Sequence, residues 1–243
     1  MGAEPQSLFR VMGTADFDYD KFYPINIAAI ANTVLLVARA DAPWNTMQDL
    51  LSHVQANPNK VKQYTSGPGS VPFTVNAMIG SLTKFDTIRI PFDGDGPAIA
   101  ALQGGHADIG FIASGAVIEH IKAGRLKALG VLSDKPYQGI PPMTDAPSVR
   151  NITKYLPWGS WYGVFVRKET PDDVKAKLVA AFKKAADTPK YREFMAGRGT
   201  TILNLSGAGA EQFIQRWQST TAWLYQGAGV AKKNPAELGI ARP

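Results

Sequence analysis

The middle of the chain alternates short apolar segments with amphipathic ones, and turns of small residues join them. Between residues 62 and 132 the sequence predicts three strands that each lead into a helix, followed by a further strand at 126–132. Alternation of this kind favours a parallel or mixed sheet with helices on both faces. This feature constrains the fold most strongly, and it indicates an α/β protein.

The first of these turns lies in the stretch 63–72, which reads Gln-Tyr-Thr-Ser-Gly-Pro-Gly-Ser-Val-Pro. Gly67 and Gly69 allow the backbone to turn sharply and to approach a ligand closely. Ser66 and Ser70 add hydroxyl groups, and either serine can cap the helix that follows. The N–H groups and partial positive charge at the start of that helix suit a carboxylate or a phosphate.

Two further turns of small residues follow strands, at 93–96 and at Ser114-Gly115. In open α/β sheets, ligands bind outside the carboxyl ends of the strands. An ordinary strand-to-helix turn has the same composition, so each turn alone is a weak signal. The stretch 63–72 also lacks the Gly-Lys-Ser/Thr of a P-loop and the spacing of a dinucleotide fingerprint. The convergence of three such turns nevertheless favours a binding site.

Composition narrows the functional classes. The chain has 243 residues, of which 45% are hydrophobic and 19% charged, as in a globular protein with a core. The net charge is +6, but the basic residues are scattered and form no patch for nucleic acid. A mild positive field favours small anionic ligands.

Catalytic and metal sites find no support in the sequence. The absence of cysteine excludes disulfides and thiolate metal sites. His53, His106 and His120 have no partners at metal-ligand spacing, so we expect no metal and no cofactor. Asp93 and Asp95 could form an acid pair, although aspartates in a turn are more often solvated. We therefore expect that the protein is not an enzyme.

The two ends carry weaker signals. We interpret residues 1–24 as a connector in which Asp16, Asp18 and Asp20 form a solvated loop rather than a calcium site. Residues after 227 are predicted to be a frayed tail. No apolar run is long enough for a membrane span, and the first residues lack the pattern of a signal peptide. Trp161 lies in a glycine-punctuated aromatic strand, where either core packing or stacking on a ligand is open.

Taken together, four motifs resemble a known family, the extracytoplasmic solute-binding receptors of tripartite tricarboxylate transporters, also called the Bug family. The resemblance covers essentially the whole chain, and only the combination of motifs is specific. The motifs are Tyr-Thr-Ser-Gly-Pro-Gly-Ser at 64–70, Ile-Pro-Phe-Asp-Gly-Asp-Gly-Pro-Ala at 90–98, His-Ile-Lys-Ala-Gly-Arg-Leu-Lys-Ala-Leu at 120–129, and Trp-Tyr-Gly-Val-Phe-Val at 161–166.

The resemblance implies a periplasmic-binding-protein-like fold of type II, with two α/β lobes joined by crossover strands. Residues 1–37 and 162–243 would form part of the first lobe, and 38–161 the second. Leu35 to Val37 and Gly163 to Val166 would be the crossovers. Family members begin with a further strand, glycine-rich loop and helix, so the first lobe is expected to be incomplete.

The resemblance also implies a function: periplasmic binding of a small organic carboxylate for uptake, with membrane transporter subunits as partners. The ligand-binding residues would be Ser66, Gly67, Gly69, Ser70, Ser114 and Trp161. With part of the first lobe missing, ligand affinity could be weak, and unpaired sheet edges would favour self-association. The alternative is a sensing or protein-interaction module that no longer transports solute.

Overall fold

The computed structural model describes residues 2–243, which form two compact units. The first unit comprises residues 2–31 and 160–243, and the second comprises residues 32–159. The chain therefore enters the second unit once and leaves it once. The units divide at 31/32 and 159/160, a few residues before the predicted lobe limits at 37/38 and 161/162. At the first limit the reason is that the strand that follows residue 33 pairs along its whole length inside the second unit.

A five-stranded mixed sheet forms the centre of the second unit, with the strand order β5-β4-β6-β3-β7. Strand β4 is parallel to both β5 and β6, whereas β3 is antiparallel to β6 and β7. The strands are β3 (Val34–Arg39), β4 (Lys62–Thr65), β5 (Ile88–Pro91), β6 (Ile109–Ala113) and β7 (Leu126–Val131).

The helices of the second unit connect these strands as the alternation predicted. They are α2 (Met47–Ala56), α3 (Val71–Gly80), α4 (Asp95–Gln103), α5 (Ser114–Lys122) and the 3-10 helices η3 (Met143–Asp145) and η4 (Pro147–Tyr155). Helix α2 begins at a capping box, in which Thr46 Oγ1 accepts a hydrogen bond from Asp49 N at 3.1 Å and Asp49 Oδ2 accepts one from Thr46 N at 3.0 Å.

The core of the second unit lies on both faces of its sheet. Val34 to Val37 are all 0% exposed, so this part of β3 is covered on both sides. One face packs Leu35 and Val37 against residues from α4 and α5, including Leu102 and Val117. A sheet buried in this way holds the strand ends, and the loops that leave them, in fixed positions.

The first unit is organised around a four-stranded sheet with the order β1-β8-β2-β9, in which all pairs are antiparallel. Its strands are β1 (Gly2–Ala3), β2 (Phe22–Ala31), β8 (Ser160–Arg167) and β9 (Thr201–Leu205). Its helices are η1 (Glu4–Leu8), α1 (Phe9–Met12), η2 (Tyr19–Lys21), α6 (Asp172–Ala186), α7 (Pro189–Gly197) and α8 (Gly207–Gly227).

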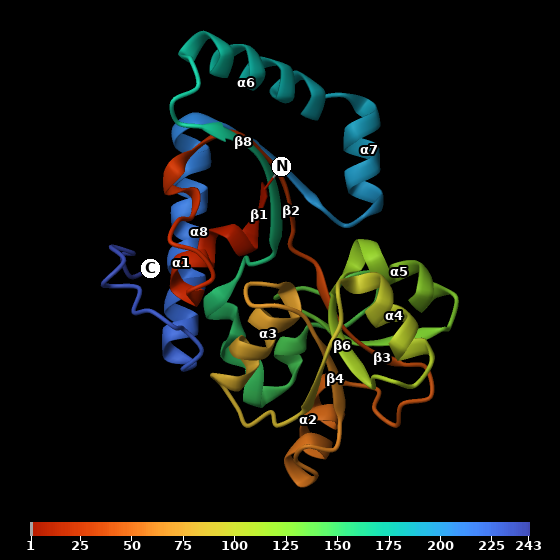
Figure 1. Cartoon of the computed structure of the whole chain (residues 1–243). Coiled ribbons are helices and arrows are strands. Elements are labelled where there is room, and N and C mark those ends of the chain that lie inside the picture. Colours follow the sequence, from red (N-terminus) through yellow and green to blue (C-terminus); the bar gives the residue numbers. More distant parts are fainter. Residues whose placement is uncertain (1) are drawn as a thin grey trace. The chain divides into compact units, whose positions relative to one another are not determined.

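Helices α8 and α6 both contact β2. Figure 1 shows α8 and α1 to the left of the strands of this unit and α6 above them. Helix α8 buries Ile214, Trp217 and Leu224. In helix α6, by contrast, Ala186 is the only buried residue and Val174 is 38% exposed.

The N-terminal residues are not the connector that the sequence suggested. Leu8 and Val11 are buried, at 1% and 0% exposure. Asp18 is 3% exposed, and its Oδ2 accepts hydrogen bonds from Arg10 Nε at 2.7 Å and Gln218 Nε2 at 3.0 Å. Asp18 is therefore a buried, paired carboxylate rather than part of a solvated loop. Its partner on α8 lies 200 residues further along the chain.

The C-terminal tail is also ordered, contrary to the prediction of a frayed end. Trp223 Nε1 donates a hydrogen bond to the carbonyl oxygen of Ala241 at 2.9 Å, and Ser219 Oγ donates to the same oxygen at 2.6 Å. Ile240 is buried at 7% exposure, and the Arg242 guanidinium lies 4.2 Å from the centre of the Trp223 ring. These contacts hold the tail against α8.

Candidate functional site

The topology of the second unit gathers three helix starts at one edge of its sheet. Because β4 is parallel to β5 and β6, the carboxyl ends of these three strands lie at the same edge. Each strand leads through a short loop into a helix: β4 into α3, β5 into α4, and β6 into α5. The order β5-β4-β6 places the loop before α3 between the other two. The N–H groups at these helix starts face the loops.

Loop 66–70 connects β4 to α3. Gly67 and Pro68 are exposed, and Ser66 is half-buried. The loop closes through a hydrogen bond from Ser70 N to Gly67 O at 3.2 Å. Gly69 has φ = 87°, a left-handed conformation that favours glycine. Gly67 is not in that region, and a Cβ added there would have no neighbour within 4 Å. The turn therefore depends on Gly69 rather than on both glycines.

Ser70 occupies the N-cap position of α3 but does not cap it with its side chain. Its main-chain oxygen accepts a hydrogen bond from Thr74 N at 2.9 Å, as in a regular helix. Its Oγ is buried and has no hydrogen-bond partner among the described residues. The predicted capping role is therefore wrong for this side chain, and a buried hydroxyl without a partner requires another explanation. Val71 is the first residue of α3 and has a main-chain N–H group, whereas Pro72, the second residue, has none.

Ser114 begins α5 at the neighbouring strand end. Its main-chain N–H donates a hydrogen bond to Thr33 O at 2.8 Å, and the residue is 2% exposed. Its amide is therefore already used inside the unit. The structure places Ser114 at the same sheet edge as loop 66–70.

The remaining predicted site residue, Trp161, lies outside the second unit. It belongs to β8 of the first unit and is 0% exposed. Its ring lies 5.3 Å from the centre of the Tyr19 ring and 6.0 Å from that of Phe213, measured between ring centroids. Its ring packs among other aromatic rings of the first unit, and a contact between Trp161 and a ligand stays a prediction.

Two residues that we treated as scaffold or turn form a polar pair at the same edge. Tyr64 Oη donates a hydrogen bond to Asp95 Oδ1 at 3.1 Å, although Tyr64 lies in β4 and Asp95 begins α4. Tyr64 is 1% exposed and Asp95 is half-buried, whereas Asp93 is exposed. Asp95 is therefore not the solvated turn carboxylate that its spacing from Asp93 suggested.

The electrostatics of this pair follow from burial. Burial raises the pKa of Asp95, and the hydrogen bond from Tyr64 opposes that shift. Burial also raises the pKa of Tyr64, with a further contribution from the Asp95 carboxylate, and a hydrogen bond with Ser66 acts in the opposite direction. The hydrogen bond from Tyr64 to Asp95 thus links β4 to the start of α4.

A cavity of about 320 Å³ opens at the same edge of the second unit. It lies beside the segment that precedes β3 and the end of β7, and its lining includes Asn32, Ser133, Asp134 and Thr153. Its volume is within the range of small-molecule sites. Loop 66–70 does not contribute to this lining. A separate cavity of about 260 Å³ lies in the first unit, where Arg10, Lys168 and Gln218 are among its lining residues.

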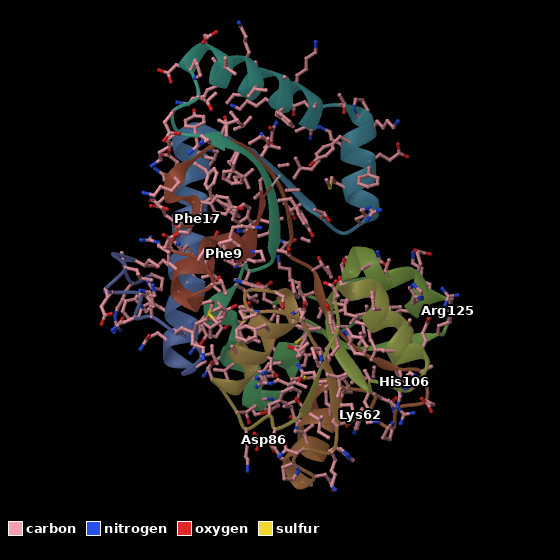
Figure 2. The ribbon with its side chains drawn as sticks, in the orientation of Figure 1. Phe9, Phe17, Lys62, Asp86, His106 and Arg125 are labelled. Carbon is pink, nitrogen blue, oxygen red and sulfur yellow. The ribbon has the colours of Figure 1, made fainter. Side chains whose placement is uncertain are left out.

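His106 follows the end of α4, and His120 lies in the last turn of α5, so both are at the far ends of these helices from their starts. Figure 2 labels His106 together with Arg125, which follows the end of α5, and Lys62, which begins β4. Within residues 2–243, no group of three or more His, Asp or Glu side chains could hold a metal ion. No helix in that part of the chain has the length and apolar content to cross a membrane.

Comparison with known proteins identifies the family. The model of the tripartite tricarboxylate transporter family receptor matches residues 12–228. A UPF0065 protein of Bordetella pertussis is 29% identical over 214 residues, which are 88% of this chain and 65% of the relative. The chain thus spans about two thirds of that relative's length.

Solved structures give the same fold. The periplasmic binding protein BugD superimposes with a TM-score of 0.83 at 23% identity, over 95% of this chain and 78% of BugD. MatC from Rhodopseudomonas palustris, solved with bound malate, superimposes with a TM-score of 0.78 at 22% identity, over 93% of this chain and 77% of MatC. These likenesses establish a periplasmic-binding-protein fold, and with the family match they show that the chain belongs to the tripartite tricarboxylate transporter receptor family.

Proposed function

We propose that the protein is a non-enzymatic receptor that binds a small organic carboxylate, and that loop 66–70 holds the carboxylate group. The observation that carries this proposal is the gathering of three helix starts at one sheet edge, with the unpartnered Ser70 hydroxyl in the central loop. A helix start contributes about 0.3–1 kcal/mol to the binding of an anion near it. A carboxylate oxygen also accepts hydrogen bonds from main-chain N–H and hydroxyl groups.

The family supports the rest of the proposal. Receptors of tripartite tricarboxylate transporters work with membrane subunits, so we propose that the loaded protein delivers its ligand to such subunits from the periplasm. MatC carries malate, a dicarboxylate, and this motivates dicarboxylates as the first ligands to test.

Calorimetry with the purified chain tests the proposal. Titration with a panel of di- and tricarboxylates should give saturable heats, and Ser70→Ala should weaken binding about tenfold, because one hydrogen bond to a charged group is lost. Ser52→Ala is the matched control, because Ser52 is exposed on α2. Equal affinities for Ser70→Ala and the wild type would remove loop 66–70 from the site.

A second candidate function is a protein-interaction module. Strand β9 is at the edge of the first unit's sheet, and the neighbouring helix α6 leaves Val174 exposed. Open edges and exposed apolar side chains promote association with another chain. Sedimentation over a range of concentrations tests this function: a dimer whose formation ignores carboxylates would favour it over solute binding.

A further inference from the structure

The cavity of about 260 Å³ in the first unit shares no residue with loop 66–70. Its walls are the start of β2 with the turn before it, the end of β8, helix α8 and one side chain of α1. Its volume lies just below the usual range of about 300–1,000 Å³ for small-molecule sites, so a ligand there is small. The α8 residues that line it recur at the spacing of a single helix face: Glu211, Ile214, Gln215 and Gln218.

The buried Asp18 carboxylate holds two polar side chains of this cavity in place. Asp18 Oδ2 accepts hydrogen bonds from Arg10 Nε at 2.7 Å and from Gln218 Nε2 at 3.0 Å. Gln218 Nε2 also donates to Ser7 O at 2.6 Å, so both N–H groups of this amide are used. The Gln218 Oε1 atom and the Arg10 Nη groups have no hydrogen-bond partner among the described residues. The cavity thus offers a fixed fork of donors close to a fixed acceptor.

The other polar side chains of the lining also combine donors with acceptors. Lys168 and Glu211 are exposed, have opposite charges and form no ion pair within residues 2–243. The exposed amide of Gln215 supplies both a donor and an acceptor. Asp20 is already paired with Lys21 at 3.5 Å. The open groups of the lining therefore carry no net charge that a ligand ion would neutralise.

Aromatic rings form the apolar part of the lining. The Phe165 ring stacks on that of Tyr19, with 4.1 Å between the ring centroids and 24° between the planes. The Phe22 ring meets the Tyr19 ring edge-on, at 6.4 Å and 72°. All three residues line the cavity and are half-buried. Because the rings hold one another in place, they give the cavity a rigid apolar wall.

We infer that the cavity of the first unit binds a monosaccharide. A sugar hydroxyl both donates and accepts hydrogen bonds, so neighbouring hydroxyls match the Arg10 fork and Gln218 Oε1 together. The C–H groups of the sugar ring are apolar and suit the aromatic wall. A carboxylate only accepts and would leave Gln218 Oε1 unmatched, whereas an ammonium group only donates and would face Arg10. This inference does not depend on the proposed function, because the whole lining belongs to the first unit.

Calorimetry tests the inference with D-glucose, D-galactose and D-mannose, each paired with its open-chain alditol. At least one sugar should give saturable heats, and its alditol should bind about tenfold more weakly, because an open chain has no ring face and loses more freedom on binding. Gln215→Ala and Lys168→Ala change two different walls. Each should weaken sugar binding about fivefold, the loss expected for one neutral hydrogen bond. Gln212→Ala is the matched control, because Gln212 is exposed on α8 and does not line the cavity.

Three results would overturn the inference: none of the three sugars binds, a sugar and its alditol bind equally, or both cavity variants keep the affinity of Gln212→Ala. The last result would place the sugar outside this cavity. Because the titrations contain no carboxylate, their outcome is separate from that of the receptor function. Circular dichroism of each variant confirms that a lower affinity is not lost folding.

Discussion

Tyr64 and Asp95 lie 31 residues apart in the sequence, yet Tyr64 Oη donates a hydrogen bond to Asp95 Oδ1 at 3.1 Å. The parallel pairing of β4 with β5 produces this contact, because it aligns Tyr64 with Ile90 and so brings the start of α4 to the end of β4. The sheet that buries Tyr64 therefore also fixes the position of the Asp95 carboxylate, at the edge where the helices begin.

Asp95→Asn should change how stability depends on pH. Burial raises the pKa of Asp95 in the folded state, so the folded state binds this proton more tightly than the unfolded state does. The wild-type carboxyl group therefore favours folding below its unfolded pKa of about 3.9, and this contribution is lost as the pH rises through the higher folded value.

Urea unfolding of the wild type and of Asp95→Asn at a series of pH values measures this effect. The stability of the wild type relative to the variant should fall as the pH rises from about 3.9 and then level off above the folded pKa. A relative stability that rises with pH would mean that the folded state favours the ionised form.

Arg10→Ala should destabilise the protein strongly. Asp18 is 3% exposed, and Arg10 is the cation paired with it at 2.7 Å. Removal of one partner leaves a buried charge without compensation, and we expect a loss of about 3 kcal/mol in the free energy of unfolding. Arg192→Ala is the control: its pair with Asp187 is 57% exposed on both sides and should be worth less than about 1 kcal/mol. Equal losses in the two variants would contradict the buried pairing.

Gly69→Ala and Gly67→Ala should have different effects, although the two glycines share one loop. Gly69 has φ = 87°, where an alanine costs about 1–2 kcal/mol. Gly67 has no such conformation, and its added Cβ would meet no atom within 4 Å, so we expect a change within about 0.5 kcal/mol. Thermal unfolding of both variants measures the difference. A larger loss for Gly67→Ala would show that the loop adopts another conformation in solution.

The sequence predicted the elements that depend on local patterning. The stretch 62–132 does alternate as predicted, with strands β4 to β7 and helices α3 to α5. Alternation of strands and helices was sufficient to predict a mixed sheet with loops at its carboxyl edge. These features follow from short-range rules of periodicity and capping.

Contacts between distant segments were not predictable in the same way. The burial of Asp95 depends on which strand lies beside β4, and the pairing of Asp18 depends on Gln218 in α8. The tail after residue 227 has no periodic pattern, yet Trp223 and Ser219 hold its main-chain carbonyl groups. Trp161 illustrates the same limit, because an aromatic residue in a strand is more often a core residue, and the pattern alone does not distinguish this from a ligand contact.

Main-chain amide shifts in a ¹H–¹⁵N NMR titration test the central claim most directly. The titrant is a carboxylate that calorimetry has shown to bind. As it is added to the labelled protein, we predict the largest shift changes at the amides of loop 66–70 and Val71, with smaller changes at the start of α5. Amides near the exposed Arg192 should not move. Saturable binding that leaves the amides of Gly69, Ser70 and Val71 unshifted would contradict the claim that this helix start holds the carboxylate.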